Sequence, residues 1–157
     1  MTLEVLYEDN HVIVCYKPAG VLSQADNTGD IDMLTLVKDY LKKRYNKEGN
    51  VFVGLVHRLD RMTSGVMVFG KTSKGAMRLS NDIANGVIFI EYLAVCEGNI
   101  EDYDETTLID YLEKDEKLNK SFISKNGKEA ELTYQVIKNK GDKCLVKVKL
   151  KTGRHHQ

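Results

Sequence analysis

The chain has 157 residues, of which 42% are hydrophobic and 29% are charged, as is ordinary for a globular domain with a core. Lys and Arg together number 23, as do Asp and Glu, so the net charge gives no general support for nucleic-acid binding. No apolar run is long enough to cross a bilayer, and the N-terminus lacks the sections of a signal peptide. We therefore expect a cytoplasmic protein with no membrane partner.

The cysteines and histidines predict neither a disulfide framework nor a metal site. Cys15, Cys96 and Cys144 are odd in number and far apart, and each lies in an apolar, strand-like run. This pattern predicts buried free thiols. His155 and His156 are adjacent and have no third ligand at a suitable spacing, whereas a zinc site needs at least three protein ligands.

The first part of the chain alternates strand and helix signals. Two apolar runs within Leu3–Tyr16 are separated by an Asp-Asn turn signal, which predicts a hairpin or a strand entered from a turn. Asp30 or Asp32 then caps an amphipathic helix that stops near Gly49. Apolar alternation over residues 51–55 predicts a strand that leads into the most constrained stretch of the chain.

That stretch is Val56–Thr72, VHRLDRMTSGVMVFGKT, which predicts a charged loop followed by a strand. Asp60 lies between Arg58 and Arg61, and nearby cations favour the ionised form of a carboxyl group. An ionised and oriented carboxylate can act as a nucleophile. A purely structural ion pair between Arg and Asp is the alternative at this point, since such networks are common.

The end of this stretch also matches the pattern of a phosphate-binding loop. Gly65–Thr72 reads GVMVFGKT, which satisfies G-x-x-x-x-G-K-[ST]. Such a loop needs flexible residues and a helix that begins at its lysine, so that backbone N–H groups can point at phosphate. The four residues between the glycines are apolar and predict a buried strand instead. An NTPase is therefore only a remote alternative.

The second half of the chain predicts one more helix and several strands. Asn126-Gly127 between alternating runs is typical of a tight hairpin turn. With two helices against six or seven short strands, the pattern indicates an α+β domain on a largely antiparallel sheet. The predicted elements are a helix over 73–85, a strand over 87–95, an acidic irregular segment over 99–118 with a possible short helix over 108–118, a hairpin of 121–124 with 129–137, and a strand over 144–150.

Four motifs resemble those of the RluA family of pseudouridine synthases, and they occur in the family's order. The most specific is His57-Arg58-Leu59-Asp60 with Thr63-Ser64-Gly65 and Lys71. The others are Lys17-Pro18-Ala19-Gly20, Tyr92-Leu93-Ala94-Val95 and Thr152-Gly153-Arg154-His155-His156-Gln157. One departure is Ile90, where the family usually has a lysine. The resemblance implies the pseudouridine synthase fold, a mixed, largely antiparallel sheet with flanking helices.

The resemblance also implies an isomerase that converts uridine to pseudouridine in structured ribosomal or transfer RNA without a cofactor. It assigns catalysis to Asp60, which acts on the ribose as nucleophile or base, to Arg154 as its ion-pair partner, and to Tyr92 as a wall of the uracil pocket. Arg58 would fill the gap left by the extruded base, and Lys17 would shape the site or touch RNA. The remaining predicted RNA contacts are Arg61, Lys71 and Lys74.

Two further expectations concern the extent of the chain and a rival function. By resemblance, residues 1–157 form a single catalytic domain that has no N-terminal RNA-binding accessory domain and lacks a C-terminal segment after the last motif. An incomplete sheet edge would then invite pairing with another copy. The rival function is a non-catalytic RNA-binding fragment, which the same basic residues would serve without chemistry at Asp60.

Overall fold

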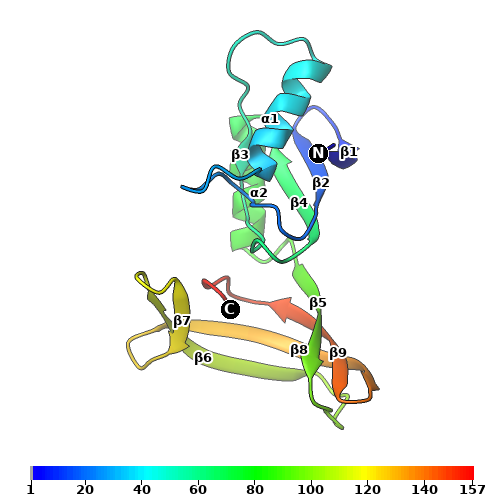
Figure 1. Ribbon diagram of the computed structural model, residues 1–157, viewed down its shortest axis with the longest axis vertical. Helices are drawn as coiled ribbons and strands as arrows, with labels where there is room; N and C mark the ends of the chain where they lie inside the picture. The colour runs from blue at the N-terminus through cyan, green and yellow to red at the C-terminus, as the bar shows by residue number, and fades with distance from the viewer. Residues whose placement is uncertain (1) are drawn as a thin grey trace. The chain divides into compact units, whose positions relative to one another are not determined.

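A computed structural model describes residues 2–157, and the chain divides after Asn85 into two compact units. Figure 1 shows both helices in the first unit, together with four strands, whereas the second unit is built from strands alone. Every pair of neighbouring strands is antiparallel. The α+β class with two helices agrees with the prediction from sequence, but residues 2–157 contain nine strands, which form two sheets.

Unit 1 contains a four-stranded sheet in the order β1-β2-β4-β3. Its two inner strands pair along their whole length, from Val12 opposite Gly70 to Lys17 opposite Gly65. The turn between the first two strands is closed by Asp9, whose carboxylate accepts hydrogen bonds from the backbone N–H groups of His11 and Val12. The strands are β1 (Glu4–Glu8), β2 (Val12–Lys17), β3 (Gly54–Leu55) and β4 (Gly65–Gly70).

Helix α1 (Met33–Arg44) supplies one side of the unit 1 core. It begins after Asp32, whose side chain accepts a hydrogen bond from the Thr35 N–H at 3.0 Å, so the second of the two predicted caps is the one used. Apolar residues at helical spacing are buried with inward-facing residues of the two inner strands. The fully buried members of this core are Ile13, Cys15, Met33, Val37, Met67 and Phe69.

Helix α2 (Ser73–Ala84) lies close against β3 and β4 because two glycines remove side chains from its path. A Cβ atom at Gly70 would lie 2.5 Å from the Ala76 nitrogen, and one at Gly54 would lie 2.4 Å from the Ala76 Cβ. The helix begins after Thr72, whose hydroxyl accepts from the Gly75 N–H at 3.0 Å. The motif GVMVFGKT is therefore a buried strand followed by a capped helix, as predicted.

Unit 2 is a five-stranded sheet in the order β5-β9-β8-β6-β7. Val136, Cys144 and Val146 form its buried cluster, with Ala94 and Val148 packed against it. These residues lie on one face of three neighbouring strands. The strands are β5 (Ile90–Glu97), β6 (Thr106–Asp115), β7 (Lys120–Ile123), β8 (Lys128–Lys140) and β9 (Lys143–Leu150).

Two predictions for unit 2 are wrong because long-range pairing decides the structure. The segment predicted as irregular with a short helix forms β6, which pairs with β8 from Thr106 opposite Tyr134 to Leu112 opposite Lys128. The predicted hairpin across the Asn-Gly turn does not form either, since β7 and β8 both pair with β6. Gly127 is needed for this arrangement, because a Cβ atom there would lie 2.6 Å from the β6 backbone.

The cysteine prediction holds for two of the three positions. Cys15 and Cys144 are buried free thiols, but Cys96 is exposed. Cys96 lies near the end of β5, an edge strand with only β9 beside it, so little covers its side chain. Burial raises the pKa of the Cys15 thiol to about 12, which makes that cysteine inert.

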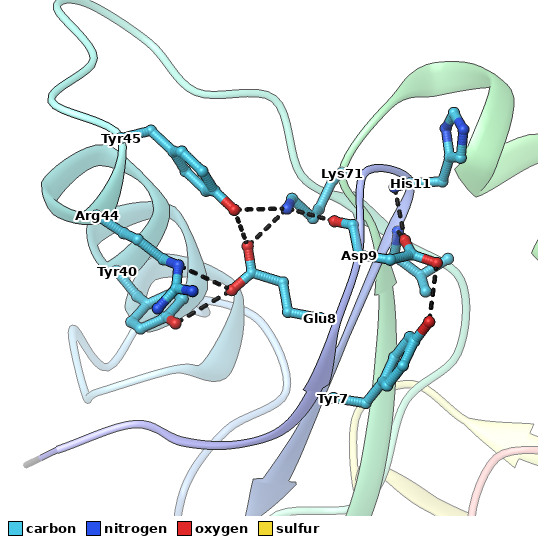
Figure 2. A network of polar contacts seen from close by, with 9 residues as sticks. Tyr7, Glu8, Asp9, His11, Tyr40, Arg44, Tyr45 and Lys71 are labelled. Atoms are coloured by element: carbon cyan, nitrogen blue, oxygen red, sulfur yellow. Dashed lines mark hydrogen bonds and ion pairs between the residues drawn. The ribbon is translucent and has the colours of Figure 1, made fainter.

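A polar network around Glu8 joins β1, α1 and the residue after β4 (Figure 2). The Glu8 carboxylate accepts from the Lys71 ammonium and the Tyr45 hydroxyl, each at 2.6 Å, and from the Tyr40 hydroxyl at 3.1 Å. The Arg44 guanidinium lies 3.4 Å away. Burial opposes ionisation of Glu8, but the hydrogen bonds from Lys71 and the tyrosines outweigh it and keep the Glu8 pKa below its ordinary value.

Replacing Glu8 with Gln should destabilise unit 1, because the side chains of Glu8 and Lys71 are only 9% and 11% exposed. Removing one partner of a largely buried ion pair leaves the other charge buried without a partner. We therefore expect the free energy of unfolding, measured with urea at pH 7, to fall by about 3 kcal/mol. Because the folded-state pKa of Glu8 is lowered, this difference is full above pH 4.5 and shrinks as the pH falls further. Glu4→Gln, on the exposed side of the same strand, is the matched control and should change little.

Candidate active site

Asp60 lies on the loop between β3 and β4, at the centre of the most specific motif. Its side chain is exposed, whereas the preceding Leu59 is buried at 8% exposure. The loop turns back directly after it, since the Thr63 N–H donates to the Asp60 carbonyl at 3.0 Å. The Asp60 carboxylate is thus exposed to solvent, while the backbone of its loop is held in place.

The backbone before Asp60 is held by Ser23. The Ser23 hydroxyl donates to the Leu59 carbonyl at 2.6 Å and accepts from the Leu59 N–H at 3.0 Å. Ser23 is only 5% exposed, so both bonds lie away from water. One hydroxyl therefore satisfies both backbone groups of the residue next to Asp60.

The backbone after Asp60 is held by Lys17 at the end of β2. The Lys17 ammonium donates to the carbonyls of Arg61 at 3.0 Å, Val21 at 2.6 Å and Pro18 at 3.2 Å. The Arg61 carbonyl also accepts from the Gly20 N–H at 2.8 Å. The Lys-Pro-Ala-Gly motif and the loop of Asp60 are thereby joined at one point.

Lys17 is a buried cation with a complete set of acceptors. It is fully buried, and its three donors meet three carbonyl oxygens. Burial lowers the pKa of its ammonium, while the negative charge of Asp60 acts in the opposite direction. Of the two roles expected for Lys17, the structure favours shaping of the site over direct contact with RNA.

His57 anchors the start of the same loop. Its Nε2 accepts a hydrogen bond from the Val68 N–H in β4 at 3.0 Å, so the ring carries its proton on Nδ1. Strand β3 ends at Leu55, so its backbone no longer pairs with β4 at Val68. The His57 imidazole accepts the hydrogen bond from the Val68 N–H instead. Burial lowers the pKa of His57, which favours the neutral ring that this bond requires.

Neither Arg58 nor Arg61, the two arginines near Asp60, forms an ion pair with the Asp60 carboxylate within residues 2–157. The Arg61 guanidinium forms an ion pair with Asp30 at 2.8 Å and donates to the Gly20 carbonyl at 3.2 Å. Arg58 is exposed, and within residues 2–157 its guanidinium has no ion-pair partner. The expected hold on Asp60 by flanking guanidinium groups is thus replaced by contacts to the backbone, and Arg58 stays available to a ligand.

The two lysines predicted to contact RNA after the loop differ in exposure. Lys71 binds the Glu8 carboxylate, the Asp9 carbonyl at 2.5 Å and the Tyr45 hydroxyl at 3.2 Å (Figure 2), so its ammonium is engaged within unit 1. Lys74 is exposed in the first turn of α2. Only Lys74 of this pair is placed for an external contact.

Tyr92 and Arg154, the other predicted catalytic residues, belong to unit 2. Tyr92 is half-buried in β5 and lies opposite Val148 of β9. Arg154 is exposed beyond β9, where its Nε donates to the Glu129 carbonyl at 2.6 Å and its backbone N–H donates to the Gln157 side chain at 2.9 Å. Their meeting with Asp60 in one pocket stays a prediction.

The described residues contain neither a spanning helix nor a metal cluster. No helix within residues 2–157 is long and apolar enough to cross a membrane. In the same part of the chain, no three His, Cys, Asp or Glu side chains lie together in a way that could hold a metal ion.

Comparison with known proteins identifies the family. The profile described as RNA pseudouridylate synthase matches residues 11–157. The chain belongs to this family. The fold agrees, since two solved human RNA pseudouridylate synthase domain-containing proteins, numbered 4 and 1, superpose with TM-scores of 0.79 and 0.76 at 20% identity. They match 98% and 99% of this chain and 61% and 62% of their own lengths.

This pseudouridylate synthase family chain also resembles curated bacterial proteins. It is 33% identical over 162 residues to ribosomal large subunit pseudouridine synthase D of Borreliella burgdorferi, a match that covers 99% of the chain and 49% of the relative. An uncharacterized RNA pseudouridine synthase of Bacillus subtilis is 32% identical over 164 residues, with 100% and 52% covered. The chain thus spans about half the length of the curated relatives it matches.

The main residue that sequence reasoning missed is Ser23. It stands in the polar, turn-rich stretch 21–30, and its partner Leu59 is 36 residues away. The available signal was its place three residues after the Lys-Pro-Ala-Gly motif, in a loop that must return to the site. His57 was recognised as part of the motif, but its bond to β4 requires the register of the sheet.

Replacing Ser23 with Ala should loosen the loop of Asp60. Both backbone groups of Leu59 would lose their partner in a buried place, and we expect a loss of about 2 kcal/mol in the free energy of unfolding. The amide of Leu59 should also exchange hydrogen faster. Ser73→Ala, the same change at an exposed position in α2, is the control and should alter neither measurement.

Protonation of His57 should destabilise the protein at mildly acidic pH. The folded state keeps the ring neutral, so its folded pKa lies below the ordinary value of 6.5. The contribution of this ring is therefore complete above pH 6.5 and is lost as the pH falls through the lowered pKa. In urea titrations from pH 7.5 to 5, His57→Gln should show a smaller decline than the parent protein. Parallel declines would contradict this role.

Proposed function

We propose that this chain carries the catalytic centre of an RNA pseudouridine synthase, with Asp60 as its reacting group. The observation that carries the proposal is the exposed Asp60 carboxylate on a backbone held on both sides, by Ser23 at Leu59 and by Lys17 at Arg61. A group fixed in this way loses little further freedom when substrate arrives, which lowers the barrier to reaction.

The proposed reaction is an isomerisation that needs no co-substrate. The bond between N1 of uracil and C1′ of ribose breaks, the base turns within the site, and C5 bonds to C1′. The hydrogen at C5 leaves as a proton, and N1 takes up a proton, so that atoms and charge balance. Asp60 acts on the ribose, as a nucleophile at the sugar or as a base, and both roles need its ionised form.

The surface around Asp60 suits extrusion of the target base. A stacked uridine has to leave the helix before its glycosidic bond can be reached. The long, planar side chain of Arg58 is exposed two residues before Asp60 and can occupy the gap or pair with phosphate. Lys74 is exposed in the same unit and would contact the RNA backbone, and Arg61 would do so from its exposed ion pair with Asp30.

Unit 2 completes the centre in this proposal. Tyr92 would form a wall of the uracil pocket and assist proton movement, and Arg154 would pair with the Asp60 carboxylate. Among residues 2–157 the Arg154 guanidinium is engaged through its Nε, by the Glu129 carbonyl, which leaves the rest of the fork for a carboxylate. The two units would then act as one catalytic domain over residues 1–157.

The names of the relatives favour ribosomal RNA as the substrate. The Borreliella relative is named a ribosomal large subunit pseudouridine synthase, and so are relatives from Buchnera and Xanthomonas. Transfer RNA is the second candidate, and we place the reaction in the cytoplasm as part of the proposal. Self-association through an edge strand, β5 or β7, is a further part of the proposal that the sheet order allows.

Two other functions would leave Asp60 without a task. A non-catalytic RNA-binding fragment would use Arg58 and Lys74 alone, and the fixed backbone around Asp60 argues against it. An NTPase would need a phosphate-binding loop at Gly65–Thr72, but that segment is strand β4 followed by a lysine bound to Glu8. Backbone N–H groups committed to a sheet cannot cradle phosphate.

Asp60→Asn should abolish isomerisation without loss of RNA binding. The change keeps size and removes the charge, and the anchors at Leu59 and Arg61 are backbone contacts that the new side chain does not disturb. The measurement is tritium release from RNA labelled at C5 of uridine, together with filter binding of the same RNA. We expect release to fall at least a thousandfold, on the order of the loss when a reacting group is removed.

Asp142→Asn removes one exposed carboxylate from the turn before β9 and is the matched control. It should release tritium at the parental rate. Release by the Asp60 variant at near the parental rate would remove Asp60 from the chemistry. Binding without release by every protein, the parent included, would favour the non-catalytic fragment.

A further inference from the structure

Two of the three free cysteines lie side by side in the sheet of unit 2. Cys96 in β5 and Cys144 in β9 are directly opposite each other in the register of these antiparallel strands. Residues that are opposite each other in such a pair project from the same face of the sheet. The two thiols are far apart in the sequence, so the pairing of β5 with β9 is what brings them together.

The backbone places the two cysteines at a separation that a disulfide can span. Beyond the end of β5, the Gly98 N–H donates to the Asp142 carbonyl at 2.6 Å, so Gly98 and Asp142 continue the ladder as a hydrogen-bonded pair. Such pairs recur at every second position, and Cys96 and Cys144 therefore form the next one. Their Cα atoms are then about 5.5 Å apart, within the range of about 4.4–6.8 Å found in disulfides.

Closing the bond requires a small movement of an edge strand. The Cβ atoms of a hydrogen-bonded pair are about 5 to 5.5 Å apart, slightly more than the roughly 3.5–4.5 Å of a disulfide. Within residues 2–157, β5 pairs with β9 alone, so its end can shift towards Cys144 without breaking a second ladder (Figure 1). The bond formed in this way is strained, and strained disulfides are easily reduced. The geometry therefore suits a reversible link.

The two thiols differ in their access to solvent. Cys96 is exposed, whereas Cys144 is buried at 1% exposure. On its other side Cys144 lies opposite Asn139 of β8, whose amide donates to the Ile100 carbonyl at 2.9 Å. Ile100 packs against the buried cluster that contains Cys144. A reagent in solvent therefore reaches Cys96 first, and Cys144 is placed to react with Cys96.

The end of the sheet around Cys144 is also the part most ready to open. The Asn139 Oδ1 is buried without a hydrogen-bond partner among residues 2–157, so it has lost its hydration without a replacement. The pairing of β8 with β9 is irregular between Val136 and Lys138, just before this point. Local opening returns water to the Asn139 oxygen and gives the Cys144 thiol the freedom to move.

We propose that Cys96 and Cys144 are a thiol pair that a peroxide oxidises to a reversible disulfide across β5 and β9. Cys96 is the thiol that meets the oxidant, and Cys144 is the thiol that resolves the product. The inference uses residues of unit 2 alone and does not depend on the proposed function.

The chemistry has two steps and consumes one molecule of hydrogen peroxide. The Cys96 sulfur attacks the peroxide, so that an S–O bond forms and the O–O bond breaks, and hydroxide leaves as water with the thiol proton. The Cys144 sulfur then attacks the Cys96 sulfur, so that the S–S bond forms, the S–O bond breaks and a second water leaves. Two thiols lose two electrons, which reduce the peroxide to water. A small dithiol reverses the reaction by exchange.

The bond would fasten the edge strand that carries Tyr92. Tyr92 and Cys96 are four residues apart in β5, so they lie on the same face of the sheet. Oxidation thus fixes the end of β5 to the neighbouring strand, whereas reduction leaves it held by the ladder alone.

The test treats the folded full chain with hydrogen peroxide, blocks the remaining thiols with iodoacetamide in denaturant and digests the chain with trypsin without a reductant. Mass spectrometry should find the peptides of Cys96 and Cys144 joined within a monomer, two hydrogens lighter than their sum and separated by dithiothreitol. Cys15, buried in unit 1, should carry the blocking group. If the chain is first unfolded in urea, links to Cys15 should form as well.

Three single variants separate the roles of the thiols. Cys144→Ala removes the resolving thiol, so Cys96 should gain two oxygens and become a sulfinic acid. Cys96→Ala, at an exposed position, should slow the loss of the Cys144 thiol at least about tenfold, because the neighbouring sulfur supplies the rate. Cys15→Ala is the matched control for replacing a buried thiol and should form the link at the parental rate.

The proposal is overturned if peroxide converts Cys96 of the parent chain to a sulfinic acid while Cys144 stays free. It is also overturned if Cys96 forms covalent dimers without a link to Cys144, or if Cys144 is lost equally fast in Cys96→Ala. The last comparison alone decides the question if the variants at buried positions fail to fold. No RNA enters the test, so its result is separate from that of tritium release.

Discussion

The position of the Asp60 carboxylate depends on two buried side chains that never touch it by hydrogen bond. Ser23 and Lys17 bind the backbone of the residues on either side, at Leu59 and Arg61. Lys17 is the last residue of β2 and Ser23 follows it by six residues, so the end of one central strand fixes the loop that precedes the other. A carboxylate held through its main chain in this way keeps its side chain exposed.

The basic residues of this chain fall into two groups, those buried with internal oxygen acceptors and those exposed at the surface. Lys17 and Lys71 are internal cations, each with oxygen acceptors that compensate for lost hydration. Arg58, Lys38 and Lys42 keep their charge at the surface without ion-pair partners among residues 2–157. The net charge of the chain does not reveal these two groups. Equal numbers of basic and acidic residues are compatible both with a charged network in the interior and with a local basic surface.

Much of unit 1 could be predicted from sequence because its signals are local. The cap at Asp32, the helix after Thr72 and the strand within GVMVFGKT each follow from a few neighbouring residues. Strand β6 could not be predicted, since its acidic and apolar residues have no clear period and pairing with β8 decides its conformation. The same holds for the site. The motif around Asp60 can be recognised in the sequence, but the partners of Ser23 and Lys71 are 36 and 63 residues away, and only folding brings them together.

Because the Lys17 amine is enclosed, its chemical reactivity reports whether the loop that carries Asp60 is open or closed. Acylating reagents that attack lysines require access to a free amine, which Lys17 lacks while its Nζ is surrounded by the carbonyls of Pro18, Val21 and Arg61. Lys74, exposed on α2, has no such protection. The rate of labelling at Lys17 relative to Lys74 would therefore follow the opening of the loop. Once acylated, Lys17 could no longer return as a cation to its three oxygens, and the label would trap the open state.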